Sequence, residues 1–81
     1  MSKNILPIVG KEYALTRQRK GKCRCTVDQV HDCSTVEVPD DVWVDITVTK
    51  GSLRGIGVGS YRGVGESERV RLSLCYFGEL T

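Results

Sequence analysis

The sequence predicts an all-β fold: a small, single-domain barrel of five to six antiparallel strands spanning residues 1–81. Three observations favour this prediction. β-Branched residues are abundant, whereas the periodicity of amphipathic helices is scarce. Short runs that alternate between apolar and polar residues are separated by turn-forming residues. The chain is long enough for one domain only, and closing its sheet would remove the exposed edges through which small sheets aggregate.

The N-terminal third predicts an arm followed by a β-hairpin. Residues 1–10 form the arm, which is either less ordered than the domain or packed against it. Residues 11–18 and 23–30 are alternating runs, and the turn at 19–22 between them contains a glycine. The side chains expected on the core face are those of Tyr13, Leu15, Cys23, Cys25 and Val27.

The central third contains the clearest strand of the chain. Residues 31–34 are typical of a turn, residues 35–38 predict a short strand, and Pro39 ends it. Residues 41–49 then alternate without interruption, so one face should be buried and the other exposed. The buried face is Val42, Val44, Ile46 and Val48, and the outer face is Asp41, Trp43, Asp45, Thr47 and Thr49.

The C-terminal third predicts two further strands, at residues 53–61 and 68–77, separated by a glycine-rich turn. Three alternate glycines at 55, 57 and 59 leave one face of the first strand bare. That face suits either a strand bent sharply where the barrel closes or a groove floor for a nucleic-acid strand. In the last strand, Val70, Leu72, Leu74 and Tyr76 are expected on the core face, and Ser73, Cys75 and Phe77 on the other.

Residues 21–38, GKCRCTVDQVHDCSTVEV, resemble the middle hairpin of Tudor-type and related SH3-like barrels in their strand alternation. The resemblance covers a short part of the chain and concerns architecture. It implies an SH3/Tudor-like barrel, and a five-stranded oligonucleotide-binding barrel is the alternative architecture.

The charge of the chain is strongly polarised. Its formal net charge is only +2, yet residues 1–24 hold seven basic residues and one acid, a net +6, whereas residues 25–81 hold five basic residues and nine acids, a net −4. The densest stretch is residues 16–24, TRQRKGKCR, which has five basic residues and no acid. A localised basic lobe attracts anions, and nucleic acid above all.

We therefore expect a non-enzymatic, nucleic-acid-binding barrel with weak sequence preference, whose ligand is RNA or single-stranded DNA. The predicted phosphate contacts are Arg17, Arg19, Lys20, Lys22 and Arg24. Tyr61, with Arg54 and Arg62, is expected to stack on or clamp a strand. The alternative for the basic cluster is a solvated hairpin tip.

The alternative function is a protein-interaction module, such as an adaptor, accessory or inhibitor protein encoded by a virus or mobile element. Trp43 points outward between Asp41 and Asp45, an arrangement that suits binding of a cation or anchoring of a partner. Phe77 adds a second apolar contact. Alternatively, Trp43 is covered by the N-terminal segment at residues 5–9 or by a second subunit. In a homo-oligomer, the outer face of residues 41–49 or the last strand would be buried between subunits.

The remaining chemistry of the sequence is sparse. Cys23, Cys25, His31 and Cys33 form C-x-C-x5-H-x-C, which departs from the knuckle spacing of structural zinc sites. We therefore expect no cofactor, with zinc as the less favoured alternative. There is one histidine and no nucleophile–base pattern, so we expect no catalysis. No apolar run is long enough to span a membrane, and we expect a cytoplasmic protein with reduced thiols and no membrane partner.

Overall fold

The computed structural model describes residues 6–18, 21–39, 41–54 and 61–80. In these residues the regular structure is β-strand, with a single 3-10 turn and no α-helix, so the predicted all-β class is confirmed. The elements are β1 (Glu12–Arg17), β2 (Gly21–Asp32), β3 (Val42–Gly51), β4 (Leu53–Arg54), β5 (Tyr61–Arg62), β6 (Ser67–Arg71), the 3-10 turn η1 (Leu72–Leu74) and β7 (Cys75–Glu79).

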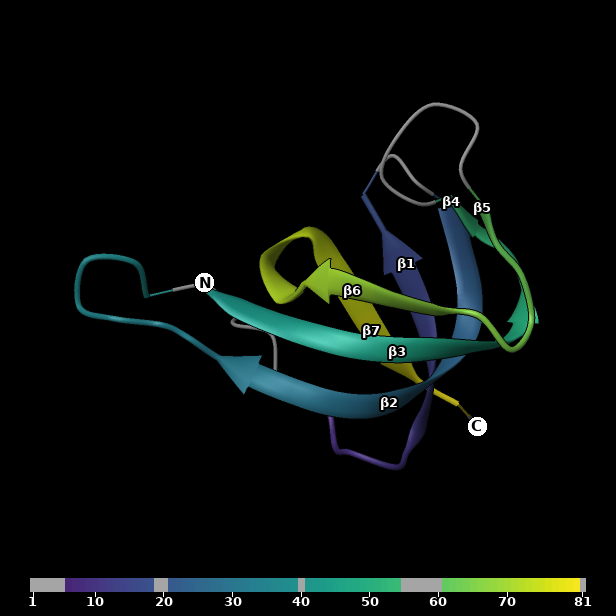
Figure 1. Cartoon of the computed structure of the whole chain (residues 1–81), viewed down its shortest axis with the longest axis horizontal. Coiled ribbons are helices and arrows are strands. Elements are labelled where there is room, and N and C mark those ends of the chain that lie inside the picture. Colours follow the sequence, from purple (N-terminus) through teal and green to yellow (C-terminus); the bar gives the residue numbers. More distant parts are fainter. Residues whose placement is uncertain (1–5, 19–20, 40, 55–60, 81) are drawn as a thin grey trace.

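Five strands form one antiparallel sheet in the order β6-β3-β2-β1-β7, and β4 pairs with β5 in a separate two-stranded ladder. The chain runs through β1, β2, β3 and β6 as neighbours, and η1 then carries it back so that β7 pairs with β1 (Figure 1). Across the described residues, β6 and β7 are the edges of the sheet and are not hydrogen-bonded to each other. The predicted closed or nearly closed barrel is therefore corrected to a curved, open sheet.

The core lies on the inner face of this curved sheet. Alternate residues of β3 are buried as the sequence predicts, and the predicted core positions Tyr13, Leu15, Cys25 and Val27 are buried as well. Each such aliphatic or aromatic side chain contributes about 1.5–3 kcal/mol by its removal from water. The core residues are Tyr13, Leu15, Cys25, Val27, Val42, Val44, Ile46, Val48, Leu53, Val70, Leu72 and Cys75.

Two bulges bend the β2–β3 ladder. Val27 pairs with Ile46 and Gln29 with Asp45, so Asp28 is an extra residue on β2. A second shift falls between Arg24 and Cys25, where the extra residue belongs to β3. A bulge changes the alternation of a strand and increases its twist. The bulge at Asp28 brings Val30, which lies opposite the buried Val44, to the core face.

The predicted last strand, residues 68–77, is in fact two strands. The 3-10 turn η1 advances the chain by three residues between them, which reverses the face on which later side chains lie. Leu74 and Tyr76, predicted to be core residues, are therefore exposed, whereas Cys75 is buried. Phe77 packs against the core and meets Tyr13 edge to face, with ring centroids 5.7 Å apart, which corrects its predicted outward position.

Three other sequence predictions differ from the structure. Residues 35–38 form a hydrogen-bonded turn and no strand. The predicted strand 53–61 begins in β4 and ends in β5, which pair with each other, so its two ends belong to a hairpin. The glycines at 55, 57 and 59 lie outside the described residues, as do Asp40 and residues 1–5 of the predicted arm. Within residues 6–10, Gly10 donates its backbone N–H to the Val27 carbonyl at 2.7 Å, which ties this segment to β2.

Candidate nucleic-acid interface

β2 connects two ends of the molecule that differ in charge. Its first residues lie beside the β4–β5 hairpin, and its last residues lead into the projecting connection to β3 (Figure 1). Twelve residues of extended chain have a contour length of about 36 Å. The basic residues Lys22 and Arg24 lie at the first end, and Asp32 lies at the other.

The register of four strands gathers cations on the outer face of the first end. Residues directly opposite one another in a sheet lie on the same face. The first row is Lys22, Thr16 and Tyr76, and the second row is Lys50, Arg24, Ala14 and Gly78. The basic residues of both rows, Thr16 and Tyr76 are exposed. We call Lys22, Arg24, Lys50, Thr16 and Tyr76 the basic face.

Tyr76 is an exposed aromatic residue on this surface, and its ring lies beside Gly78. Its side chain is 65% exposed, and a Cβ atom placed on Gly78 would lie 3.1 Å from the Tyr76 Cε2 atom. One edge of the ring therefore lies close to the bare backbone of Gly78, and most of Tyr76 remains exposed to solvent. Lys22 lies two strands away in the same row, about 10 Å along the sheet. An exposed aromatic ring at this distance from a cation suits a base and its neighbouring phosphate.

The cations of the basic face have no ionic partner within the described chain. No ion pair there involves Lys22, Arg24 or Lys50, whereas Lys11, Arg17, Arg62, Arg69 and Arg71 each pair with a carboxylate. Unpaired surface cations create a local positive potential that attracts anions. Arg19 and Lys20, which follow β1 and precede β2 in the sequence, lie outside the described residues.

Arg17 does not belong to the basic face, which corrects its predicted place on an exposed hairpin. It is 7% exposed, and its Nη1 atom donates to Glu68 Oε2 at 3.0 Å. Glu68 is 9% exposed and also pairs with Arg62, whose Nε atom lies 3.1 Å from Oε1. A buried charge is stable only when it is paired and hydrogen-bonded. Arg17 and Arg62 therefore bind an internal carboxylate.

The other predicted clamp residues lie on the β4–β5 hairpin. Tyr61 is 55% exposed and pairs across the ladder with Arg54, of which the structure describes only the backbone. β4 contacts β2, which places this hairpin at the same end of the molecule as the basic face. Tyr61 is therefore a second exposed aromatic residue at that end.

Trp43 lies on the outer face of β3, as predicted. Its indole N–H and its ring face are, however, already in contact with other residues of the chain. The indole Nε1 donates to Asp41 Oδ1 at 2.9 Å, and the Arg71 guanidinium carbon lies 4.8 Å from the ring centroid. Arg71 is opposite Trp43 in the β3–β6 ladder, so the cation–π contact is a cross-strand pair. The side chain is half-buried. The cation expected to bind Trp43 from outside is thus supplied by Arg71.

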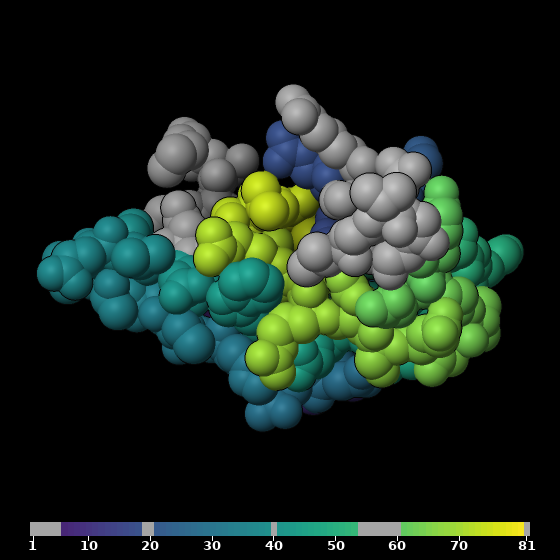
Figure 2. All heavy atoms as spheres, turned by 45° about the horizontal axis from the view of Figure 1, so that its top comes forward, coloured from purple at the N-terminus to yellow at the C-terminus, as the bar shows by residue number. Residues whose placement is uncertain are grey.

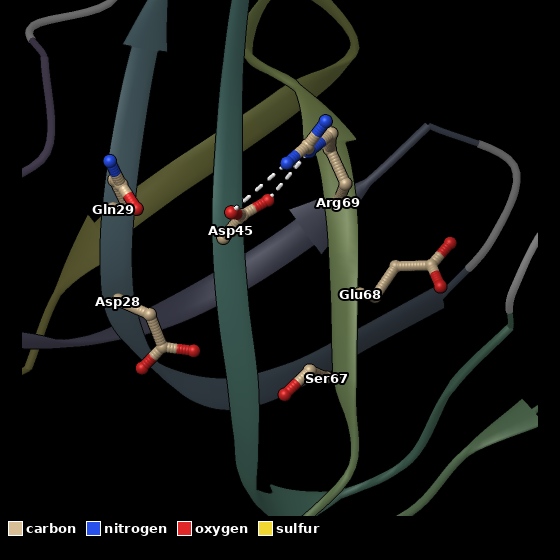
Figure 3. Close-up of a pocket in the computed structure, with 6 residues that line it drawn as sticks. All are labelled: Asp28, Gln29, Asp45, Ser67, Glu68 and Arg69. Carbon is tan, nitrogen blue, oxygen red and sulfur yellow. Dashed lines mark hydrogen bonds and ion pairs between the residues drawn. The ribbon is translucent and has the colours of Figure 1, made fainter.

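Asp45, the second acidic neighbour of Trp43, is the centre of a polar cluster. Arg69 Nε donates to its Oδ1 at 2.8 Å, and His31 Nε2 lies 2.8 Å from its Oδ2. The hydrogen bonds from Arg69 and then from His31 lower the pKa of the Asp45 carboxyl below its usual value. The cluster borders a shallow depression of about 510 Å³ lined by Asp28, Gln29, Asp45, Ser67, Glu68 and Arg69. Figure 3 shows Arg69 turned onto Asp45, whereas Glu68 points away from them.

The predicted alternative zinc ligands have separate surroundings. Cys25 is buried in the core, Cys23 is partly buried, Cys33 is exposed, and His31 is bound to Asp45. The described residues contain no group of three or more ligand side chains placed to hold a metal ion. Burial raises the pKa of Cys25 to about 12 and that of Cys75 to about 11, so both are held as thiols.

Three members of the basic face, Thr16, Lys50 and Tyr76, were missed by the sequence prediction. Lys50 follows the end of the strand predicted at residues 41–49, and it joins the face because β3 continues to Gly51. Tyr76 was assigned to the core, and its true position depends on η1. The signal that favours Tyr76 is the glycine two residues later, since an aromatic ring on an exposed strand packs well over a bare backbone position.

No helix in the described parts of the chain combines the length and apolar character needed to cross a membrane. Comparison of the chain with protein-family models, with curated proteins and with solved structures gave no match, so the candidate site rests on the geometry described above.

Proposed function

We propose that this protein binds single-stranded nucleic acid through the basic face, without catalysis. The observation that carries the proposal is the alignment of three cations, Lys22, Arg24 and Lys50, beside the exposed ring of Tyr76 on one surface. None of the three has an ionic partner among the residues that the structure describes. Cations on neighbouring strands match the repeating charge of a phosphate backbone, and an aromatic ring accepts any base by stacking.

The expected mode of binding follows from these side chains. Lys22, Arg24 and Lys50 contact phosphates, one base stacks on Tyr76, and the Thr16 hydroxyl lies between them as a hydrogen-bonding group. Lysine and arginine contacts to phosphates carry no sequence information, and stacking is tolerant of base identity. Sequence preference is therefore weak.

We also propose that the curved sheet has an SH3/Tudor-like architecture. The return of β7 to β1 and the short turn η1 between β6 and β7 support it, together with the strand alternation of residues 21–38. This architecture leaves one outer surface of the sheet open to a ligand, and the basic face lies on that surface.

The test is titration of the purified protein into dye-labelled 15-nucleotide RNA and DNA, single-stranded and duplex, with fluorescence anisotropy as the readout. We expect saturable binding at about 50 mM salt that weakens strongly by about 200 mM. Arg24→Glu/Lys50→Glu should weaken binding at least about tenfold, because it removes two phosphate contacts and adds repulsion.

The matched control is Lys11→Glu/Arg69→Glu, which changes the net charge equally at cations that already pair with Glu79 and Asp45. Circular dichroism confirms that each variant is folded. We expect the control to change affinity far less than the basic-face variant. Absence of binding by the wild-type protein at low salt, or equal losses in both variants, would refute the proposal.

A further inference from the structure

The connection between β2 and β3 ends in an exposed apolar turn. We call residues 33–39 the β2–β3 tip, and Figure 2 shows it projecting from the body of the molecule. Val36 is 101% exposed and Val38 is 50% exposed, although both are apolar and β-branched. Exposed apolar side chains on a projecting turn gain free energy when another surface covers them.

The tip is held in one conformation by its own hydrogen bonds. Cys33 donates its backbone N–H to the Asp41 carbonyl at 2.8 Å, and Thr35 donates to the Val38 carbonyl at 2.9 Å. The Val38 N–H donates in turn to Thr35 Oγ1 at 2.9 Å, and the Ser34 N–H donates to Asp32 Oδ1 at 3.0 Å. Because the turn is already ordered, docking it onto a surface loses little conformational entropy.

The β2–β3 tip and the basic face are complementary. The tip contains one acid, Glu37, and no basic residue, and Asp32 precedes it at the end of β2. Asp41, which follows the tip, already accepts a hydrogen bond from Trp43 and pairs with Arg71. The basic face offers three unpaired cations and the exposed ring of Tyr76, and Leu74, 48% exposed, is close to it in the chain. One surface therefore combines negative charge with valine side chains, and the other combines positive charge with an aromatic ring.

The two surfaces cannot meet within one molecule, because they lie at opposite ends of β2. We propose that the β2–β3 tip of one molecule docks onto the basic face of a second copy of this chain. Val36 covers Tyr76, and the Glu37 carboxylate approaches Lys22, Arg24 and Lys50. Such head-to-tail contact is heterologous, and it extends or closes into a ring according to its geometry. A single turn covers a small area, so the association is weak.

The second copy and nucleic acid use the same face, so on the proposed function their binding is mutually exclusive. Self-association itself needs no nucleic acid and is tested without it. We expect sedimentation equilibrium of the full chain at several hundred micromolar and about 50 mM salt to give a mean mass above the 9.0 kDa of one chain. The mean mass should return to that of the monomer at about 500 mM salt.

Two variants separate the halves of the interface. Val36→Lys/Glu37→Lys abolishes the apolar and acidic character of the tip but leaves the basic face intact. Arg24→Glu/Lys50→Glu abolishes the positive charge of the basic face but leaves the tip intact. Each variant alone should be monomeric. An equimolar mixture should form a heterodimer and nothing larger, because each molecule then supplies one intact half. Val36→Asp, which adds a negative charge to the tip but removes its apolar side chain, should weaken self-association because the contact with Tyr76 is lost.

The outcomes distinguish this inference from the proposed function. The tip variant should bind RNA as tightly as the wild type. Self-association without RNA binding would support the docking and refute the function, and RNA binding by a strictly monomeric wild type would do the reverse. A wild type that stays monomeric at low salt overturns the docking. So does association that persists in both variants, which would assign it to another surface such as the edge of β6 or β7.

Discussion

Arg17 and Glu68 form a buried ion pair between strands that are not neighbours in the sheet. Arg17 is on β1 and Glu68 on β6, and their side chains meet across the inner face, with 3.0 Å between Nη1 and Oε2. Their pairing links β1 directly to an edge strand that the hydrogen-bond ladder joins to it only through β2 and β3. The electrostatic contact thus holds the curvature where strand pairing is absent.

Substitution of Arg17 should therefore affect stability more than binding. Arg17→Met leaves the buried Glu68 with one fewer partner, and we expect the free energy of unfolding to fall by about 2–4 kcal/mol. Urea denaturation followed by tryptophan fluorescence measures this change. Arg17→Met/Glu68→Leu should recover part of the loss, because no unpaired carboxylate then remains inside. Affinity for RNA below the unfolding range should not change, and a large loss would restore Arg17 to the binding face.

Neighbouring aromatic residues on β7 should respond in opposite ways. Phe77 packs against Tyr13 in the core, so Phe77→Ala should destabilise the fold by about 3 kcal/mol. Tyr76 is exposed, so Tyr76→Ala should change stability by less than about 0.5 kcal/mol. The same Tyr76 substitution should weaken RNA binding by about 5-fold or more through lost stacking. Equal effects of the two variants on stability would contradict the reversal at η1.

The salt dependence of RNA binding should report the number of phosphates that the protein contacts. Three contacts from Lys22, Arg24 and Lys50 give a log–log slope of about −2 on single strands, and additional contacts from Arg19 and Lys20 would steepen it toward −3.5. Arg24→Ala should reduce the steepness by about 0.7. Anisotropy titrations at several salt concentrations provide the slope. A slope that Arg24→Ala leaves unchanged would remove this residue from the interface.

Protonation of Asp45 in acid should lower the free energy of unfolding, because its hydrogen bonds to Arg69 and His31 join β2, β3 and β6. Hydrogen bonds from Arg69 and His31 hold the pKa of Asp45 below the unfolded value of 3.8, so the folded state favours the carboxylate. This contribution is fully present above pH 3.8 and is lost as the pH falls through the lower, folded pKa. Asp45→Asn should therefore lose less stability than the wild type between about pH 6 and pH 3, measured by urea midpoints. An identical loss in both proteins would show that Asp45 contributes nothing.

The four cysteines should differ in reactivity. Burial holds the pKa of Cys25 at about 12 and that of Cys75 at about 11, and it also raises the pKa of Cys23. Cys33 is exposed on the tip. Iodoacetamide at about pH 8 should modify Cys33 first and reach Cys25 and Cys75 only after unfolding, since few thiolates form at the buried sites. Peptide mass spectrometry reads the order, and rapid modification of Cys25 in the native protein would contradict its burial.

The sequence predicted the strands whose alternation is uninterrupted. In β3 each residue keeps one face from Val42 to Val48, so period two was sufficient. It failed where local backbone geometry changes the period, at the bulge beside Asp28 and at η1, because neither has a strong sequence signal. The same limit affected the prediction of the basic face. The charge of residues 16–24 correctly indicated the end of the molecule at which the basic face lies. However, Arg17 is buried and does not belong to the basic face, and the change of face at η1 brings Tyr76 onto it.

Turn η1 also indicates how the chain can tolerate changes in length. Deleting one residue from Leu72–Leu74 would exchange the faces of β7, turning Phe77 to solvent and Tyr76 to the interior, whereas the β2–β3 tip can gain or lose residues without altering any strand register. Homologous chains should therefore align without gaps at η1 and vary in length at the tip. In a chain with an alignment gap at η1, the residue next to the outward aromatic residue of β7 should face solvent in its place.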